Sequence, residues 1–359
     1  MNIIFRVDAS LQMGTGHVMR CLTLAQVLKD NGTDAEFICR KHEGDLIDKI
    51  RSSGFVVHEL RVFEEIEFDN KLAHSHWLGA TQQQDGDDCI NILKAEKLDW
   101  LIVDHYALDE QWQKRLKPYY EKLMVIDDLA DREHQCDLLL DQNLVVDMNS
   151  RYNHLVNNSC HRLLGPKFSL LQPIYGKLHG SANKRMLIKR IIISFGGCDN
   201  HNLTELFIRA LVNLNIVDIH VDVVLSKSSP NFKSVKNRVK GYLNIHLYSD
   251  LPSLAELMAN SDLFIGASGA TTWERLCLRL PSIVTTLAHN QEAVAHELHS
   301  KGLIHLIGSN QDVTIEKAEH AIRYIIEQYR ESCQMLEMHK IIDGMGSIYV
   351  SNTIFKLME

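Results

Sequence analysis

Short apolar runs rich in β-branched residues alternate with longer amphipathic stretches along the whole chain. This alternation is the pattern of βαβ units, which build parallel sheets covered by helices, and it leaves few other folds open. In the first half it predicts strands at residues 3–7, 35–39, 101–103, 123–126 and 138–140. In the second half it predicts strands at residues 191–195, 219–225, 244–247, 263–266 and 282–285. The clearest helices are expected at residues 18–30, 203–213, 253–259, 271–278 and 292–301.

A candidate linker lies between the two halves, at residues 165–190. It contains Pro166 and Pro173, followed by a polar stretch at residues 180–184. Proline and small polar residues in this arrangement are typical of a connection between domains. The sequence therefore predicts an α/β protein with two Rossmann-like, doubly wound domains that face a central cleft. The sequence predicts an N-terminal domain at residues 1–172, a linker at residues 173–189 and a C-terminal domain at residues 190–345. A final helix at residues 346–359 is expected to pack back on the first domain.

Charge and cysteine content exclude several classes of protein. The 359 residues carry 38 Lys and Arg against 46 Asp and Glu, a net charge of −8, and the basic residues form no block. A nucleic-acid-binding protein or a stable membrane-surface protein needs a cationic patch, so neither partner is expected. There is no stretch of about 18 apolar residues, and Arg6 and Asp8 interrupt the N-terminal apolar run too early for a signal peptide. The eight cysteines form no C-x-x-C pair, which favours free thiols in the cytoplasm.

The loop after the first predicted strand carries the most distinctive motif, Gly14-Thr15-Gly16-His17, which opens a helix. In open parallel sheets, ligands bind where strands end and helices begin, because free N–H groups point there. The motif lacks the third glycine of a dinucleotide-binding loop, since Met19 occupies that position. His17 is placed to act as a general base, and Arg20 follows one turn later. The alternative reading is an ordinary tight turn with a solvent-exposed histidine.

Three further polar clusters follow predicted strands of the first half: Asp104-His105-Tyr106, Asp127-Asp128 and Asp141-Gln142-Asn143. All should lie at the same edge of the sheet as His17, which makes a coherent binding region. Adjacent carboxylates sometimes bind a metal, but without a third ligand at a suitable spacing the pair Asp127-Asp128 is read as a turn or cap. A metal ion is therefore not expected at this pair. The pairs His74/His76 and His296/His299 are read as surface residues for the same reason.

The second half offers two glycine-containing turns before helices, at Gly196-Gly197 and at residues 267–274. Small residues and hydroxyl groups at a helix start suit a diphosphate, and Glu274 one turn later is placed to accept hydrogen bonds from ribose hydroxyls. Asn290-Gln291 lies at another helix start after the last predicted strand. The alternative is a generic glycine turn with a surface glutamate.

The segments Arg6-Val7-Asp8-Ala9-Ser10 and Gly14 to Arg20 together resemble the opening motif of a bacterial family of nucleotide-sugar hydrolases. This family comprises the UDP-2,4-diacetamido-2,4,6-trideoxy-β-L-altropyranose hydrolases of pseudaminic acid biosynthesis. Asp104-His105-Tyr106, Asp127-Asp128, Gly196-Gly197 and Asn290-Gln291 follow in matching order, so the resemblance extends over most of the chain. The segment ending at Glu274 also resembles the nucleotide-binding helix of the wider two-domain glycosyltransferase fold. The chain is longer than compact members of the family between residues 60 and 95.

The resemblance implies a function for particular residues. It makes His17 the base that activates water, and it makes Tyr106 and Asn290 polar residues that line the sugar pocket. It makes Glu274 the acid that binds the ribose and the backbone of residues 269–272 the diphosphate site. It implies that UDP is released with inversion at the anomeric carbon, without metal or cofactor, and that the partners are a UDP-sugar and water. The predicted substrate-binding residues are Gly14, Gly16, Arg20, Asp104, Tyr106, Gly197, Ser268, Gly269, Ala270, Thr271, Glu274, Asn290 and Gln291. Two alternatives remain: a glycosyltransferase in which His17 deprotonates a sugar hydroxyl, and a non-catalytic nucleotide-sugar sensor.

Overall fold

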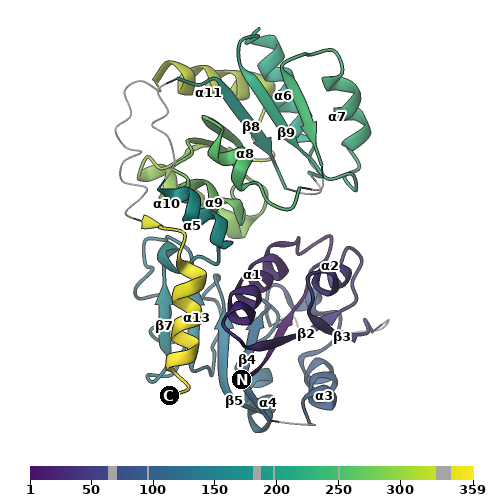
Figure 1. Ribbon diagram of the computed structural model, residues 1–359, viewed down its shortest axis with the longest axis vertical. Coiled ribbons are helices and arrows are strands. Elements are labelled where there is room, and N and C mark those ends of the chain that lie inside the picture. The colour runs from purple at the N-terminus through teal and green to yellow at the C-terminus, as the bar shows by residue number, and fades with distance from the viewer. Residues whose placement is uncertain (64–70, 95–96, 181–186, 197–198, 250, 329–340) are drawn as a thin grey trace. The chain divides into compact units, whose positions relative to one another are not determined.

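The computed structural model describes residues 1–63, 71–94, 97–180, 187–196, 199–249, 251–328 and 341–359. The chain forms two compact units (Figure 1). Unit 1 consists of Met1–Asn143, Asp147–Leu171 and Met345–Glu359, and unit 2 consists of Leu144–Val146 and Gln172–Gly344. Each unit is built around one parallel sheet, so the predicted α/β class is confirmed.

Unit 1 contains a seven-stranded parallel sheet in the order β3-β2-β1-β4-β5-β6-β7. Its strands are β1 (Asn2–Val7), β2 (Asp34–Arg40), β3 (Val56–Leu60), β4 (Leu98–Asp104), β5 (Tyr120–Ile126), β6 (Leu138–Asp141) and β7 (His161–Leu164). Its α-helices are α1 (Gly16–Asp30), α2 (Ile47–Ser52), α3 (Gln82–Leu93), α4 (Glu110–Leu116) and α13 (Gly346–Lys356). Its 3₁₀ turns are η1 (Ser75–Leu78), η2 (Lys117–Tyr119) and η3 (Pro166–Phe168).

Unit 2 contains a six-stranded parallel sheet in the order β10-β9-β8-β11-β12-β13. Its strands are β8 (Arg190–Ser194), β9 (His220–Val224), β10 (Ile245–Tyr248), β11 (Leu263–Ala267), β12 (Ser282–Thr286) and β13 (His305–Ser309). Its helices are α5 (Pro173–His179), α6 (Leu203–Asn213), α7 (Phe232–Val239), α8 (Ala255–Ala259), α9 (Thr271–Cys277), α10 (Glu292–Ser300), α11 (Ile315–Gln328) and the 3₁₀ turn η4 (His289–Gln291). Helix α5 occupies the first part of the expected linker, where Tyr175 is fully buried.

The alternation of side chains along the strands explains why both faces of each sheet are covered. Ile3, Phe5 and Val7 of β1 belong to the apolar cluster on one face of the unit 1 sheet, whereas Ile4 belongs to the cluster on the other face. Strands that are buried on both sides need near-continuous apolar runs, and this is why they were recognisable in the sequence.

Helix α13 completes unit 1 although it follows all of unit 2 along the chain (Figure 1). Its residues Val350 and Ile354 are fully buried in the same apolar cluster as β1 and α1. The Ser347 hydroxyl donates a hydrogen bond of 2.9 Å to the carbonyl oxygen of Leu171. Gly346 allows this approach, because a Cβ atom there would lie 2.3 Å from the carbonyl oxygen of Ser169.

All ten predicted strands are present, but β3, β7 and β13 were missed. Each of the three lies at the end of its sheet, where one strand edge has no partner and less of the side-chain surface is buried. Their sequences, VVHEL, HRLL and HLIGS, are short and partly polar, so they carry a weak apolar signal.

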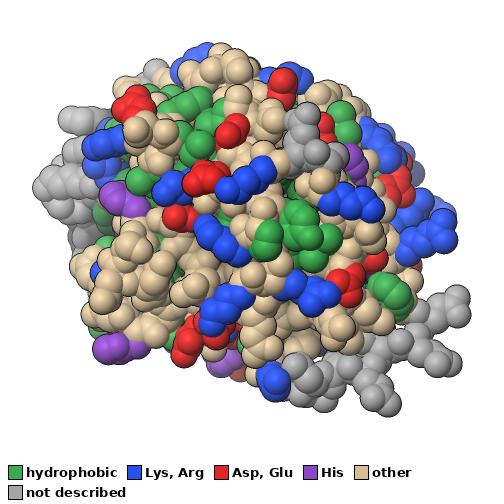
Figure 2. All heavy atoms as spheres, turned by 90° about the horizontal axis from the view of Figure 1, so that it is seen from below, with side chains coloured by type: hydrophobic (Ala, Val, Ile, Leu, Met, Phe, Trp, Pro, Cys, Tyr) green, Lys and Arg blue, Asp and Glu red, His purple; other side chains and the backbone are tan. Residues whose placement is uncertain are grey.

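On the face shown in Figure 2, Lys and Arg side chains are interspersed with Asp and Glu side chains. Within the residues that the structure describes, no helix has the length and apolar character to cross a membrane.

Candidate active site

His17, Asp104 and Arg20 form a compact group in unit 1. Asp104 is the last residue of β4, and the other two lie on the first turns of α1. His17 Nδ1 lies 2.7 Å from Asp104 Oδ1, and Arg20 Nη2 donates to the same oxygen at 2.6 Å. Arg20 Nε donates to Asp104 Oδ2 at 2.6 Å. The structure thus joins Asp104 to two predicted site residues, His17 and Arg20, that precede it by 87 and 84 positions in sequence.

The ionisation of Asp104 determines which nitrogen of His17 carries the proton. Burial alone would raise the pKa of Asp104, but the charge of Arg20 and the hydrogen bonds from Arg20 and His17 hold that pKa well below its usual range. Arg20 Nη2 also lies 3.2 Å from His17 Nδ1, but the contact of Nδ1 with Asp104 is shorter, at 2.7 Å. Because an ionised carboxylate only accepts hydrogen bonds, the tautomer with the proton on Nδ1 is the one that bonds to Asp104. The neutral imidazole therefore has its free lone pair on Nε2, the nitrogen that can accept a proton from water.

Asp104 was expected to contact substrate, but its side chain is fully buried and both oxygens are engaged by His17 and Arg20. The contacts give it the function of orienting the histidine. Arg20 is also largely buried, and its Nη1 donates to Asp128 Oδ2 at 2.9 Å. Arg20 therefore connects the carboxylate at the end of β4 with the one that follows β5.

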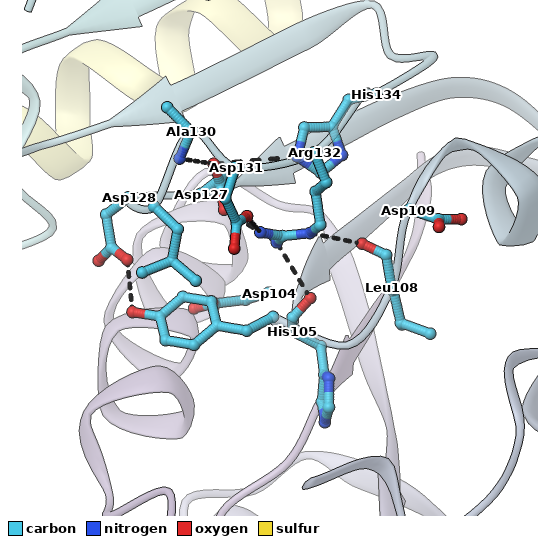
Figure 3. Close-up of polar contacts among 12 residues, drawn as sticks. Asp104, His105, Leu108, Asp109, Asp127, Asp128, Ala130, Asp131, Arg132 and His134 are labelled. Atoms are coloured by element: carbon cyan, nitrogen blue, oxygen red, sulfur yellow. Dashed lines mark hydrogen bonds and ion pairs between the residues drawn. The ribbon is translucent and has the colours of Figure 1, made fainter. Parts of the chain in front are cut away.

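Tyr106 lies beside His17, with their rings 4.6 Å apart at an edge-on angle of 84°. Its hydroxyl donates a hydrogen bond to Asp128, drawn as a dashed line in Figure 3. Tyr106 is only 5% exposed, and burial, followed by the charge of Asp128, raises the pKa of its hydroxyl well above the usual value. Tyr106 thus lies beside the predicted base, and most of its ring is covered by protein.

Asp127 and Asp128 enter separate interactions. Asp127 forms an ion pair with Arg132 at 2.8 Å and accepts hydrogen bonds from the Tyr152 hydroxyl and the Ala130 N–H. Figure 3 shows Arg132 directed toward the backbone carbonyl groups of the loop after β4. Its Nε donates a hydrogen bond to the carbonyl oxygen of Leu108 at 2.9 Å. Arg132 therefore ties the loop after β5 to the loop after β4. Asp127 thus contacts Arg132, Tyr152 and Ala130, whereas Asp128 contacts Arg20 and Tyr106.

The third polar cluster lies on the same side. Asp141, at the end of β6, forms an ion pair with Arg151 at 3.1 Å. Burial and the negative charge of Asp128 raise the pKa of Asp141 to about 7. Gln142 is buried, and its side-chain oxygen accepts a hydrogen bond from the Leu170 N–H.

The Arg6-x-Asp8 part of the N-terminal motif is buried beneath the site. Arg6 donates to Asp8 at 2.6 Å and to Asp85 of α3 at 2.6 Å, and Arg40 of β2 also donates to Asp85. His105 Nε2 faces Asp8 at 3.3 Å. This network connects β1, β2, α3 and the loop after β4, so the motif residues hold the sheet edge that carries His17 and Asp104.

The glycine loop before α1 contains one residue with a positive φ. Gly14 has φ +74°, and its N–H donates to the Ser10 carbonyl oxygen at 2.8 Å, which closes a tight turn. Gly16 is the first residue of α1. No side chain caps this helix start, so its first N–H groups are available to other partners.

In unit 2, the predicted diphosphate-binding residues lie between β11 and α9. Ser268 follows β11 directly, its Oγ is buried, and its N–H donates to the Thr285 carbonyl oxygen at 3.0 Å. Ala270 is the N-cap of α9 without a side-chain cap, and Thr271 begins the helix. Gly269 approaches Gln291, because a Cβ atom built on it would lie 4.0 Å from the Gln291 Nε2 atom. The structure therefore brings Ser268, Gly269, Ala270, Thr271 and Gln291 together.

Glu274 lies one turn into α9, and its side chain is partly exposed. Burial of its carboxylate raises the pKa to about 7, and interactions with Tyr175 and Arg275 oppose this shift. Hydrogen bonds from the hydroxyl groups of a ligand would therefore stabilise the ionised form of this buried carboxylate more than that of an exposed one.

The remaining predicted residues of unit 2 are Asn290, Gln291 and Gly197. Asn290 is exposed in η4. Gln291 uses its side-chain oxygen to accept a hydrogen bond from the Leu287 N–H at 2.9 Å. Gly197 lies outside the described residues, and its neighbour Gly196 has φ +89°.

Two cavities among the described residues lie away from His17. The first, of about 270 Å³, is lined by Lys114, Lys117, Tyr120 and Cys136 among others, at the opposite end of β5 from Asp127. The second, of about 210 Å³, lies in unit 2 beside η4 and the ends of β12 and β13. Only the second adjoins a predicted site residue, since it includes His289 next to Asn290.

Across the described ranges, no group of three or more His, Cys, Asp or Glu side chains is arranged to hold a metal ion. His74 packs against Trp77, with ring centroids 4.4 Å apart, and His76 contacts the same indole ring. His299 Nδ1 lies 3.2 Å from the Ile304 carbonyl oxygen.

Sequence reasoning missed three residues that contribute to the His17 surroundings. Asp128 was placed at the polar edge of the sheet but was given no contact with Arg20 or Tyr106, and Arg132 and Trp77 were not singled out. The signal for Asp128 was its position directly after a buried strand. Nothing in the local sequence indicated that Arg132 reaches the loop after β4 or that Trp77 stacks on Tyr106.

Comparison with solved structures defines the class of fold. The chain matches MurG of Acinetobacter baumannii over 99% of both chains with a TM-score of 0.66, at 11% sequence identity. Residues 191–343 match the family described as the glycosyltransferase family 28 C-terminal domain. The protein therefore has the two-domain glycosyltransferase fold, as predicted.

Comparison of sequences adds the particular resemblance. The chain is 29% identical over 304 residues to the UDP-2,4-diacetamido-2,4,6-trideoxy-beta-L-altropyranose hydrolase of Campylobacter jejuni. This match covers 84% of the present chain and 97% of the relative. It is also 22% identical to the spore coat polysaccharide biosynthesis protein SpsG of Bacillus subtilis, over 100% of this chain and 99% of that one. The resemblance to the hydrolases, which the motifs indicated, is thereby confirmed over most of the chain.

Proposed function

We propose that the protein hydrolyses a UDP-linked 2,4-diacetamido-2,4,6-trideoxy sugar of the altropyranose type, releasing UDP and the free sugar in pseudaminic acid biosynthesis. The observation that carries the proposal is the contact between His17 and Asp104, which leaves Nε2 of the histidine free to accept a proton. The similarity to the Campylobacter jejuni hydrolase over most of both chains supports the choice of reaction and substrate.

In the proposed reaction, His17 Nε2 removes a proton from a water molecule as the water oxygen bonds to the anomeric carbon. The bond between this carbon and the UDP oxygen breaks, and its electron pair leaves with UDP. The negative charge of Asp104 stabilises the imidazolium that forms, and Arg20 keeps Asp104 ionised. A single displacement inverts the anomeric centre.

The residues of unit 2 are proposed to bind the nucleotide. The uncapped start of α9 and the hydroxyl groups of Ser268 and Thr271 offer N–H and hydroxyl donors to the diphosphate. Glu274 is proposed to accept hydrogen bonds from the ribose. With these donors the departing diphosphate is stabilised without a metal ion.

The second candidate function is a glycosyltransferase, which the fold favours. It uses the same base on a sugar hydroxyl in place of water. A non-catalytic sensor is the third candidate, and it has no use for the base.

The decisive experiment incubates the purified protein with UDP-2,4-diacetamido-2,4,6-trideoxy-β-L-altropyranose and no acceptor, and follows UDP release. Stoichiometric release of UDP and free sugar is expected, and NMR in the first seconds should show the inverted anomer before mutarotation. UDP release that depends on an added acceptor would favour the transferase, binding without release would favour the sensor, and a retained anomer would reject direct displacement by water.

A further inference from the structure

The ring of Tyr106 is enclosed by other side chains. His74 lies 5.2 Å from it, and Trp77 stacks on it at 5.7 Å with an interplanar angle of 28°. The Arg132 guanidinium lies 5.9 Å from the ring centroid, and the His17 ring meets it edge-on. With only 5% of its surface exposed, Tyr106 has little ring face left for a sugar.

Trp77 differs from the other tryptophans of the chain. Trp100, Trp112 and Trp273 are 0%, 1% and 3% exposed, whereas Trp77 is partly exposed. It belongs to η1, within the region between residues 60 and 95 to which the motifs assign no function. An indole ring that keeps accessible surface beside the candidate base is well suited to bind the apolar face of a ligand.

His74 adds a polar group beside this indole. Its ring contacts Trp77 at 4.4 Å, and its Nδ1 atom is buried with no hydrogen-bond partner among the described residues. A buried polar atom without a partner costs free energy, so a ligand amide or hydroxyl that satisfies it is bound favourably. The pair therefore combines a flat apolar surface with a single hydrogen-bonding position.

We propose that Trp77 and His74, which we call the aromatic shelf, bind the sugar of the substrate, with Trp77 in place of Tyr106 presenting a ring face to it. The inference rests on the proposed function for the identity of the sugar. A 2,4-diacetamido-2,4,6-trideoxy sugar carries two acetamido methyl groups and a C6 methyl group, which suit an indole face. Its amides suit the Nδ1 atom of His74.

The first test compares steady-state UDP release from UDP-2,4-diacetamido-2,4,6-trideoxy-β-L-altropyranose by the variants Trp77→Leu, Trp77→Phe and His74→Phe. Trp77→Leu should raise KM about tenfold while kcat changes less than about threefold, because stacking contributes to binding rather than to proton transfer. Trp77→Phe should restore most of the affinity. His74→Phe keeps a ring but loses Nδ1, and should raise KM at least about threefold.

Two controls make the result specific. The affinity for UDP alone, measured by calorimetry, should be unchanged in all three variants because UDP lacks the sugar. Tyr324→Leu removes an aromatic ring that is 45% exposed on α11 of unit 2, and its KM should equal that of the wild type. An unchanged KM in Trp77→Leu, or an equal loss of affinity for UDP alone, would overturn the proposal.

The second test does not require turnover. In a His17→Asn background, addition of the same nucleotide sugar should change the tryptophan fluorescence beyond the change that UDP alone causes at Trp273, which lies beside the proposed nucleotide site. This additional change should be absent in His17→Asn/Trp77→Phe, and an additional change that persists there would contradict the shelf. If the wild type binds this sugar but releases no UDP, the proposed hydrolysis fails while the fluorescence result still decides the shelf.

Discussion

The imidazole of His17 and the carboxylate of Asp104 meet at 2.7 Å, and the carboxylate is held on its other side by Arg20. A histidine oriented by a buried carboxylate has a fixed tautomer and a stabilised cationic form, the two properties that a general base needs. The helix start of α1 and the end of β4 are the elements that bring these groups together.

Replacement of His17 by asparagine should lower kcat for UDP release at least about 10²-fold, the usual scale for loss of a general base. KM should stay within about threefold, because the nucleotide is proposed to bind unit 2. Steady-state kinetics checks both values, and circular dichroism shows whether the variant folds. A variant with nearly normal turnover would exclude His17 as the base.

Asp104→Asn should also lower kcat by at least about 10²-fold, because an amide can donate to Nδ1 and so stabilise the wrong tautomer of His17. Asp109→Asn is a suitable control, since Asp109 caps α4 and does not contact His17. Stopped assays of both variants test this prediction. Equal activity of Asp104→Asn and the wild type would show that the contact with His17 does not matter for turnover.

Activity should persist in excess EDTA, because N–H and hydroxyl donors at the start of α9 are proposed to stabilise the leaving diphosphate. The measurement is UDP release before and after chelation, followed by addition of magnesium. Complete loss of activity with recovery in magnesium would mean that a metal ion takes part, and Asp127 and Asp128 would have to be reconsidered.

Glu274→Ala should weaken UDP binding by about 10- to 150-fold, the range for loss of a charge-assisted hydrogen bond of roughly 1.5–3 kcal/mol. Turnover at saturating substrate should be nearly unchanged, since His17 is intact. Calorimetric titration with UDP provides the affinity. The neighbouring variant Glu292→Ala, at the start of α10, serves as the matched control, and equal affinities in the two variants would reject the placement of the ribose.

Glu274 should also make stability depend on pH. Its pKa is about 7 in the folded protein against an ordinary value of 4.5, so the folded state favours the protonated carboxyl. The contribution of this carboxyl group to the stability of the fold is fully present below pH 4.5 and is lost as pH rises through 7. The free energy of unfolding of Glu274→Gln, relative to that of the wild type, should therefore increase by on the order of 2 kcal/mol from pH 5 to pH 8. Urea denaturation at both pH values measures the difference, and a difference that is the same at pH 5 and pH 8 would contradict this origin.

The strands with two covered faces could be predicted from sequence because burial on both sides demands a continuous apolar run. The edge strands β3, β7 and β13 could not, since one open edge relaxes that demand. Helix α1 was predicted because it directly follows a glycine loop. The short helices α2 and α4 were not predicted, whereas the equally short α8 and α9 were.

In the candidate site, too, the positions of residues along the chain could be predicted from sequence, whereas contacts between distant residues could not. Position after a strand was enough to name His17, Asp104 and Tyr106, because the topology of a parallel sheet collects these positions at one edge. The pairing of Asp104 with His17 depends on contacts across 87 positions, and the stacking of Trp77 on Tyr106 depends on how the chain returns after β3. Neither leaves a periodic or spacing signal in a single sequence.

The position of α13 has a consequence for how the protein is made. A ribosome releases residues 1–171 and then all of unit 2 before Val350 and Ile354 emerge to fill the apolar cluster beside β1 and α1. During that interval the nascent first unit keeps an uncovered apolar face, while unit 2 already has every strand that it needs. We therefore expect the second unit to become protease-resistant on the ribosome before the first, an order of maturation opposite to the order of synthesis.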